Sequence, residues 1–157
     1  MSDAAWWASL DSPLGTVAVA VNDQGAVIRV VFGEAEGQRH RRADEAAKQL
    51  DQFFRGSRRD FDLELEPVGS EFEQRVWAEV VKIPFGATAT YGEIAERLGG
   101  SAVARAVGSA NAANPIAILI PCHRVVGAAG ELTGYAGGLW RKRWLLAHES
   151  GQQNLVF

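Results

Sequence analysis

Cys122 is the only cysteine of the 157-residue chain, and it stands beside His123 in a segment suited to nucleophilic chemistry. A thiol attacks carbon only as its thiolate, so it needs a neighbouring base or a positive field. Adjacent side chains in a turn do not usually hydrogen-bond directly, so a relay between the two would pass through a water. A lone cysteine is also commonly buried and inert, which leaves two interpretations of this pair.

Glu149 is a further residue that can take part in such chemistry. It stands at the end of the last expected helix, where a carboxylate opposes the helix dipole and needs a partner. A histidine is the natural partner, because a carboxylate orients the imidazole and raises its basicity. His123 and His148 are the two candidates, and a frayed surface glutamate is the alternative.

Arg105 stands on an expected helix among residues with almost no side chain. Its face carries Ala102, Gly108, Ser109 and Ala112, whereas Val103, Ala106, Val107 and Ala110 form the stripe expected to be buried. Such a face can approach a groove closely and insert one cation, although a solvated surface arginine is the simpler interpretation. A recognition helix usually carries several base-reading polar side chains, so the pattern does not favour sequence-specific readout.

Two short helices around this arginine predict a helix-turn-helix. A capping box of Thr90 and Glu93 opens the first helix, and Gly99-Gly100 separates it from a second helix that Ser101 caps and that ends near Asn111.

Two further helices are expected in the same region. Ser70 and Glu73 form a capping box before an apolar stripe that ends at Pro84. In the final helix, Trp140, Trp144 and Ala147 repeat at the spacing of a buried face.

The first third of the chain predicts a small α/β lobe. Two strands, 16–21 and 26–32, are joined by an Asn-Asp-Gln-Gly turn and form a hairpin. A helix follows over 43–54, and the alternation over 61–65 predicts a further strand with an acidic, solvated face. The linker at 67–69 divides the chain into domains 1–67 and 68–157, an α+β organisation.

Composition sets limits on the protein class. With 47% hydrophobic and 22% charged residues the chain is an ordinary globular protein. One cysteine allows neither an internal disulfide nor a Cys-rich zinc site, and no run approaches the roughly 20 apolar residues of a membrane span. Residues 1–10 lack the pattern of an export signal, so we expect a cytoplasmic protein. The net charge is −3, yet residues 101–149 carry +3, so a local contact with phosphates is compatible with the composition.

Together these segments resemble the O6-alkylguanine-DNA alkyltransferases, which repair DNA by accepting the alkyl group themselves. The resemblance covers 68–157 in order, and the N-terminal lobe fits the layout of the family, in which it is a ribonuclease-H-like scaffold beside a winged-helix-like domain. The motifs that carry it are Pro-Cys-His-Arg-Val at 121–125, Thr-Tyr-Gly-Glu-Ile-Ala at 90–95, Ala-Arg-Ala-Val-Gly at 104–108, Asn-Pro at 114–115, Gly-Tyr-Ala-Gly-Gly at 134–138 and Leu-Leu-Ala-His-Glu at 145–149.

The resemblance implies a catalytic role for five residues. Cys122 would be the acceptor thiolate, His123 its base through a water, and Glu149 the carboxylate that polarises the imidazole. Asn114 would brace the turn that carries the cysteine. Tyr91 would help extrude the nucleotide and donate a hydrogen bond or a proton to guanine N3, because neutral guanine leaves more easily than its anion.

It also implies how DNA and the damaged base are held. Arg105 would fill the gap left by the flipped base, and its neighbours would lie against the groove: Tyr91, Ala102, Ala104 and Ser109. The guanine would be read mainly by backbone groups near Cys122, Val125 and Ala136. Tyr135 and Gly137 would complete the pocket. The family often has a serine where this chain has Ala136, and the small residues at 136–138 leave room for groups larger than methyl.

The implied partner is duplex DNA carrying O6-alkylguanine, with O4-alkylthymine as a second substrate, and no metal or cofactor is required. The protein would be a monomer that reacts once, with cooperative binding along DNA left open. Three alternatives differ from this hypothesis. An alkyltransferase-like sensor has tryptophan at the position of Cys122, a cysteine hydrolase would turn over repeatedly, and a helix-turn-helix regulator needs a polar base-reading face.

Overall fold

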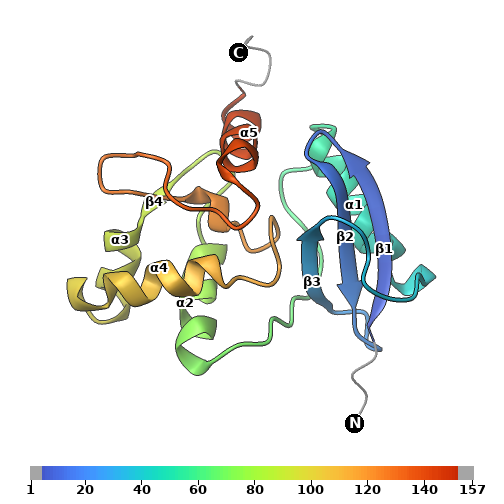
Figure 1. Ribbon diagram of the computed structural model, residues 1–157, viewed down its shortest axis with the longest axis horizontal. Coiled ribbons are helices and arrows are strands. Elements are labelled where there is room, and N and C mark those ends of the chain that lie inside the picture. The colour runs from blue at the N-terminus through green and yellow to red at the C-terminus, as the bar shows by residue number, and fades with distance from the viewer. Residues whose placement is uncertain (1–4, 152–157) are drawn as a thin grey trace. The chain divides into compact units, whose positions relative to one another are not determined.

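Residues 5–151 are described by the computed structural model shown in Figure 1. Residues 1–4, which belong to the segment inspected for an export signal, and residues 152–157 lie outside the described part of the chain. Two compact units are present: residues 5–68 together with 115–119, and residues 69–114 together with 120–151. Among residues 5–151 no helix has both the length and the apolar character needed to cross a bilayer.

The first unit contains a three-stranded antiparallel sheet in the order β1 (Trp6–Ser12), β2 (Gly15–Val21) and β3 (Val27–Phe32). The predicted hairpin of β2 and β3 is confirmed. Its turn is closed by Asn22, whose side-chain oxygen accepts hydrogen bonds from the backbone of Gln24 and Ala26, and Gly25 takes a φ of 85°. β1 was not expected from the sequence, and it pairs with β2 along its full length.

The predicted helix of this unit is confirmed as α1 (Asp44–Phe54), which packs on the sheet and buries Leu50 and Phe53 (Figure 1). The strand predicted over 61–65 is wrong, because only Leu65 forms a bridge, with Val27. The side chain of Gln49 instead satisfies the backbone N–H of Asp62 and hydrogen-bonds to its carbonyl oxygen, at 2.9 and 3.3 Å. The alternation of apolar and acidic residues over 61–65 is therefore not accompanied by pairing with a neighbouring strand along the segment.

Residues 115–119 belong to the first unit although they lie far along the chain. Val30 of β3 donates a hydrogen bond to the Pro115 carbonyl and accepts one from Ala117. Ile118 is buried and has a φ of 73°, a left-handed conformation that a β-branched residue rarely adopts. The segment is thus held by the sheet immediately before the chain enters the Cys122 region.

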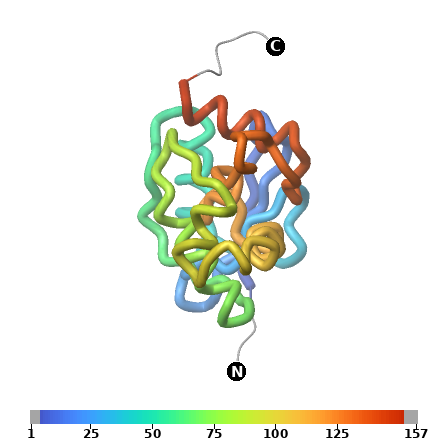
Figure 2. The backbone as a smooth tube through the Cα atoms, turned by 90° about the vertical axis from the view of Figure 1, so that its left-hand side faces the viewer, coloured from blue at the N-terminus to red at the C-terminus, as the bar shows by residue number. Residues whose placement is uncertain are grey.

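The second unit is mainly helical, with α2 (Glu71–Val81), α3 (Tyr91–Leu98), α4 (Ala104–Ala112) and α5 (Leu139–Ser150). Two short strands, β4 (Ala89–Thr90) and β5 (Val125–Val126), pair in parallel. Both predicted capping boxes are confirmed, and the helix-turn-helix consists of α3 and α4, with Gly99 ending α3. In Figure 2 the view runs almost along the axis of α4.

The start of α4 differs from the prediction. Residues Ser101–Val103 form a 3-10 helix, and α4 begins at Ala104 without a side-chain cap, so Ser101 does not cap it. Ala106 is exposed rather than part of the buried stripe, and Asn111 is buried in its place. The buried residues of α4 are thus Val107, Ala110 and Asn111, which share one helical face at spacings of three and four residues.

The buried face of α5 also differs from the prediction. Trp140 is 51% exposed, and Trp144 and Ala147 are only partly buried. The residues that α5 buries are instead Lys142, Leu145, His148 and Glu149. Helical spacing identifies residues that share a face, but here a polar face is the one that packs inward.

Candidate active site

Cys122 begins a short 3-10 helix, Cys122–Arg124, that follows Pro121. Cys122 is almost fully buried, at 7% exposure. Two side-chain amides hold the backbone around it in place. The Asn114 side chain donates to the Ile120 carbonyl at 2.8 Å, and that of Asn111 donates to the Cys122 carbonyl at 3.2 Å. Asn114 was predicted to brace this turn, whereas Asn111 was missed because a polar residue on a helix gave no sign of its burial.

Burial raises the pKa of the Cys122 thiol above its ordinary value. Asn114, the positive charge of Lys142 and Tyr135 act in the opposite direction and favour the thiolate. Burial likewise raises the pKa of Tyr135, with the nearby Cys122 as the next cause. Because burial disfavours the thiolate, formation of the thiolate depends on these neighbouring groups.

His123 is the residue that the structure pairs with Glu149. Its Nε2 lies 2.8 Å from Glu149 Oε2, and both side chains are buried. Because a carboxylate accepts hydrogen bonds, Nε2 carries the proton, and Nδ1 holds a lone pair. Within residues 5–151 this buried Nδ1 makes no hydrogen bond. The other candidate, His148, stacks on Trp144 at 4.7 Å between ring centroids.

Arg124 makes the His123–Glu149 pair part of a larger network. Its Nε and Nη2 donate to the two oxygens of Glu149, each at 2.7 Å, and its Nη1 donates to the Ile83 carbonyl at 2.6 Å. No role for Arg124 was predicted from the sequence. One feature of the sequence pointed to it: Arg124 stands directly between His123 and the apolar pair Val125-Val126, an unusual place for a surface arginine.

Two pKa values of this network are lowered. Burial and the neighbouring cations of Arg124 and Lys142 lower the pKa of His123, against the opposing effect of Glu149, so the imidazole is neutral at pH 7. Burial alone would raise the pKa of Glu149, but its hydrogen bonds with His123 and Arg124 outweigh burial and lower it to about 2. The resting site therefore contains a neutral base and an ionised carboxylate.

We expect the free energy of unfolding to fall as the pH is lowered from 7 toward 2. Both groups bind protons in the unfolded chain at a higher pH than in the folded protein, so acid favours unfolding. His123 contributes to the decline from about pH 6.5, its ordinary pKa, and Glu149 from about pH 4.5. Urea unfolding at successive pH values measures this, and His123→Gln should flatten the decline above pH 5. An equally steep decline in that variant would contradict the assignment.

Tyr91 and Tyr135 come from different segments of the second unit. Tyr91 is the first residue of α3, and its hydroxyl accepts a hydrogen bond of 2.8 Å from Thr133. Tyr135 lies beside Cys122. Val125 is fully buried, Gly137 partly buried and Ala136 exposed, and the Gly137 carbonyl accepts a hydrogen bond from Arg141. The contact of Thr133 with Tyr91 was not predicted from the sequence.

The residues predicted to contact DNA lie on the helix-turn-helix. Arg105 is exposed on α4, as are Ser109 on the same helix and Ala102 on the preceding 3-10 helix, while Ala104 is half-buried. Gly108 of α4 lies beside Tyr91 of α3, since a Cβ atom there would be 4.0 Å from the Tyr91 ring, an ordinary van der Waals contact. The bare face around Arg105 is thus next to Tyr91.

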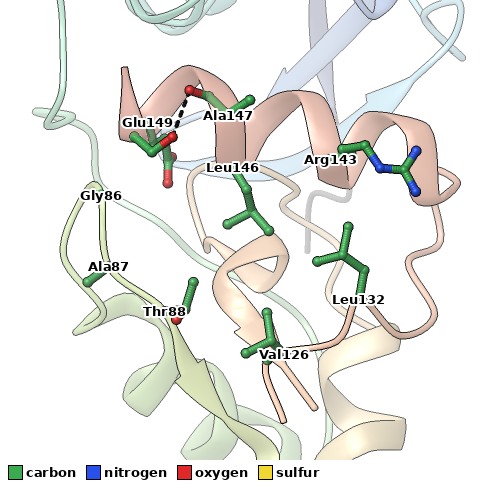
Figure 3. A pocket seen from close by; sticks show the side chains of 11 residues that line it. Gly86, Ala87, Thr88, Val126, Leu132, Arg143, Leu146, Ala147 and Glu149 are labelled. Atoms are coloured by element: carbon green, nitrogen blue, oxygen red, sulfur yellow. Dashed lines mark hydrogen bonds between the residues drawn. The ribbon is translucent and has the colours of Figure 1, made fainter. Parts of the chain in front are cut away.

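A hollow in the second unit lies along one face of α5, next to Glu149 (Figure 3). Cys122 does not line it, and neither do the residues predicted to form the substrate pocket. It is lined by Gly86, Ala87, Thr88, Val126, Gly130, Leu132, Arg143, Leu146, Ala147, Glu149 and Ser150. This hollow is therefore separate from the residues predicted to hold the substrate.

No group of three metal-binding side chains occurs among the described residues. The site is instead defined by one cysteine, a buried His–Glu–Arg network and an adjacent helix-turn-helix, which is the arrangement of a DNA-binding protein with a nucleophilic cysteine.

Comparison with known proteins gives the family. Residues 6–67 match the ribonuclease-like domain of 6-O-methylguanine DNA methyltransferase, and residues 71–151 match the DNA binding domain of the same family. The chain therefore belongs to the 6-O-methylguanine DNA methyltransferase family, which confirms the resemblance seen in its motifs.

Individual relatives agree with this assignment. The methylated-DNA–protein-cysteine methyltransferase of Mycolicibacterium paratuberculosis is 48% identical over 148 residues, with 90% of each chain covered. That of Methanosarcina acetivorans is 43% identical and covers 92% of this chain and 97% of its own. A crystal structure of Mycobacterium tuberculosis OGT in complex with DNA has a TM-score of 0.85 at 41% identity, with 93% of each chain covered. The α+β fold class is thereby confirmed.

Proposed function

We propose that this chain repairs DNA by moving the alkyl group of O6-alkylguanine, and also that of O4-alkylthymine, irreversibly to Cys122. The observation that carries the proposal is the only cysteine of the sequence beside the buried network of His123, Glu149 and Arg124. Membership of the 6-O-methylguanine DNA methyltransferase family supports the same chemistry.

The transfer is an in-line displacement at the alkyl carbon. The Cys122 proton passes through one water to His123 Nδ1, whose ring is held by Glu149 through Nε2. The sulfur then forms a bond to the alkyl carbon while the carbon–O6 bond breaks and its electron pair stays on the guanine. The Tyr91 hydroxyl donates a proton to N3, so the leaving base is neutral.

The product explains why each molecule reacts once. A thioether on Cys122 has no leaving group that His123 or any neighbouring side chain could displace. The protein is therefore consumed in the reaction, unlike a cysteine hydrolase, whose acyl intermediate is released by water.

DNA binds through α3 and α4, with the damaged nucleotide flipped out of the duplex. The small residues around Arg105 allow close approach to the groove, and the Arg105 side chain occupies the place of the flipped base. The domain of residues 68–157 carries binding and chemistry, and residues 1–67 support it. The protein acts in the cytoplasm as a monomer, and neighbouring copies can bind cooperatively along DNA.

Intact mass after incubation with duplex DNA containing one O6-methylguanine tests the proposal. Transfer of a methyl group in place of the thiol proton adds about 14 Da, once per molecule, because there is one acceptor thiol. Cys122→Ser should show no addition. Tight binding to the lesion without a mass change would leave a damage sensor, and continued consumption of substrate beyond one equivalent would indicate a hydrolase.

A further inference from the structure

Lys142 is a buried lysine that takes no part in the proton transfers and bond changes of the proposed reaction. It lies in the first turns of α5 and is 0% exposed. Within residues 5–151 no carboxylate is close enough to form an ion pair with it. Its Nζ donates instead to two backbone carbonyls, those of Val125 at 2.7 Å and Thr133 at 3.1 Å. A buried ammonium without a carboxylate is costly, so its retention requires a reason.

The two carbonyls tie together the parts of the site that surround the thiol. Val125 directly follows the 3-10 helix that begins with Cys122, and its own N–H returns to the Cys122 carbonyl. The Thr133 hydroxyl donates a hydrogen bond to the hydroxyl oxygen of Tyr91, the residue proposed to protonate guanine N3. One ammonium group thus connects α5 to the cysteine turn and to the residue that holds Tyr91.

The charges around the thiol give Lys142 a second role. Burial lowers the pKa of Lys142, and the nearby Cys122 thiolate acts against this by favouring the ammonium. The ammonium in turn favours the Cys122 thiolate. Tyr135 also faces the thiol. The remaining charged groups of the buried network, Arg124 and Glu149, largely compensate each other through two hydrogen bonds. Lys142 is therefore the cation whose charge is left to act on the sulfur.

We propose that Lys142 is a positioning residue of the transfer reaction, which holds the Val125 and Thr133 carbonyls around the site and stabilises the Cys122 thiolate with its positive charge. The proposal rests on the proposed function for its biological meaning. The interaction with the thiol exists independently of any DNA substrate, and it can be measured without one.

Three substitutions separate charge from hydrogen bonding. Lys142→Met removes both, Lys142→Gln keeps N–H donors without the charge, and Lys142→Arg keeps the charge. Lys48→Met is the matched control, because Lys48 is exposed on α1. The rate of Cys122 carboxamidomethylation by iodoacetamide, followed by intact mass between pH 6 and 11, reports the thiolate of the only cysteine. Methyl transfer from O6-methylguanine DNA is measured in parallel.

We expect the midpoint of the pH–rate profile to move up by about one unit or more in Lys142→Met and Lys142→Gln, so that the rate near neutral pH falls about tenfold. Above both midpoints the rates should converge with that of the parent protein. Lys142→Arg should retain the parent midpoint, and so should Lys48→Met.

An unchanged midpoint in Lys142→Gln, or a rate lowered equally at every pH, would overturn the proposal and leave Lys142 with a structural role. If Lys142→Met does not fold, as judged by circular dichroism, the comparison of the Gln and Arg variants decides. Absence of methyl transfer in the parent protein, with the midpoint still dependent on Lys142, would reject the proposed function and not the electrostatic role.

Discussion

Glu149→Gln should lower the rate of methyl transfer to Cys122 by about 10²- to 10⁴-fold, the usual contribution of a positioned general base. Glutamine can still hydrogen-bond to His123, but it carries no charge to stabilise the imidazolium that forms when Nδ1 takes the thiol proton. It also leaves the Arg124 guanidinium without its counter-charge, which lowers the proton affinity of His123 further. Single-turnover kinetics with duplex DNA containing O6-methylguanine measure the effect.

The control for this prediction is Glu66→Gln, because Glu66 is exposed and lies in the first unit. That variant should react at the parent rate. His123→Gln should show a loss of the same order as Glu149→Gln, since both act on one proton transfer, while equilibrium binding to the DNA stays within a few-fold of the parent. A Glu149→Gln rate within tenfold of the parent would show that the carboxylate does not assist the base.

The chemistry-bearing residues could be predicted from the sequence largely because their types are rare. A single cysteine beside a histidine, and a glutamate at the unfavourable end of a helix, are noticeable without a structure. Residue types alone left His123 and His148 as candidate partners of Glu149, and the family resemblance chose His123. Tertiary packing places His123 Nε2 2.8 Å from the carboxylate, as that choice predicted.

Residues that act through backbone groups were harder to predict. Asn111, Thr133 and Lys142 are common polar residues, and nothing in their local sequence shows that they are turned inward. Their partners are mostly carbonyl groups, which every residue possesses. Burial of such side chains follows from the way helices pack together, and periodicity does not encode it.

The fold shows the same limit. Capping boxes were predicted to the residue, because they are local hydrogen-bonding patterns within four positions. The face of α5 was predicted wrongly because its tryptophans dominate the apolar pattern, while the buried network requires Glu149 to face inward. The strand at 61–65 failed because a side chain, that of Gln49, replaced the expected ladder.

Replacing Arg124 with methionine should lower the free energy of unfolding by about 3–5 kcal/mol, the usual effect of removing one partner of a buried ion pair. The change leaves the Glu149 carboxylate buried without the two hydrogen bonds from the guanidinium, and it also frees the Ile83 carbonyl. Urea unfolding at pH 7 measures the loss. Arg75→Met, at an exposed position of α2, is the matched control and should change the stability by less than about 0.5 kcal/mol.

The double variant Arg124→Met/Glu149→Met distinguishes an orphaned charge from lost packing. Because the second substitution removes the uncompensated carboxylate, the double variant should be clearly less destabilised than the sum of the two single variants. Methyl transfer should nevertheless stay low in it, since His123 has lost the carboxylate that supports its basicity. If the two destabilisations simply add, the pair does not act as one unit, and the network around His123 would have to be explained by packing alone.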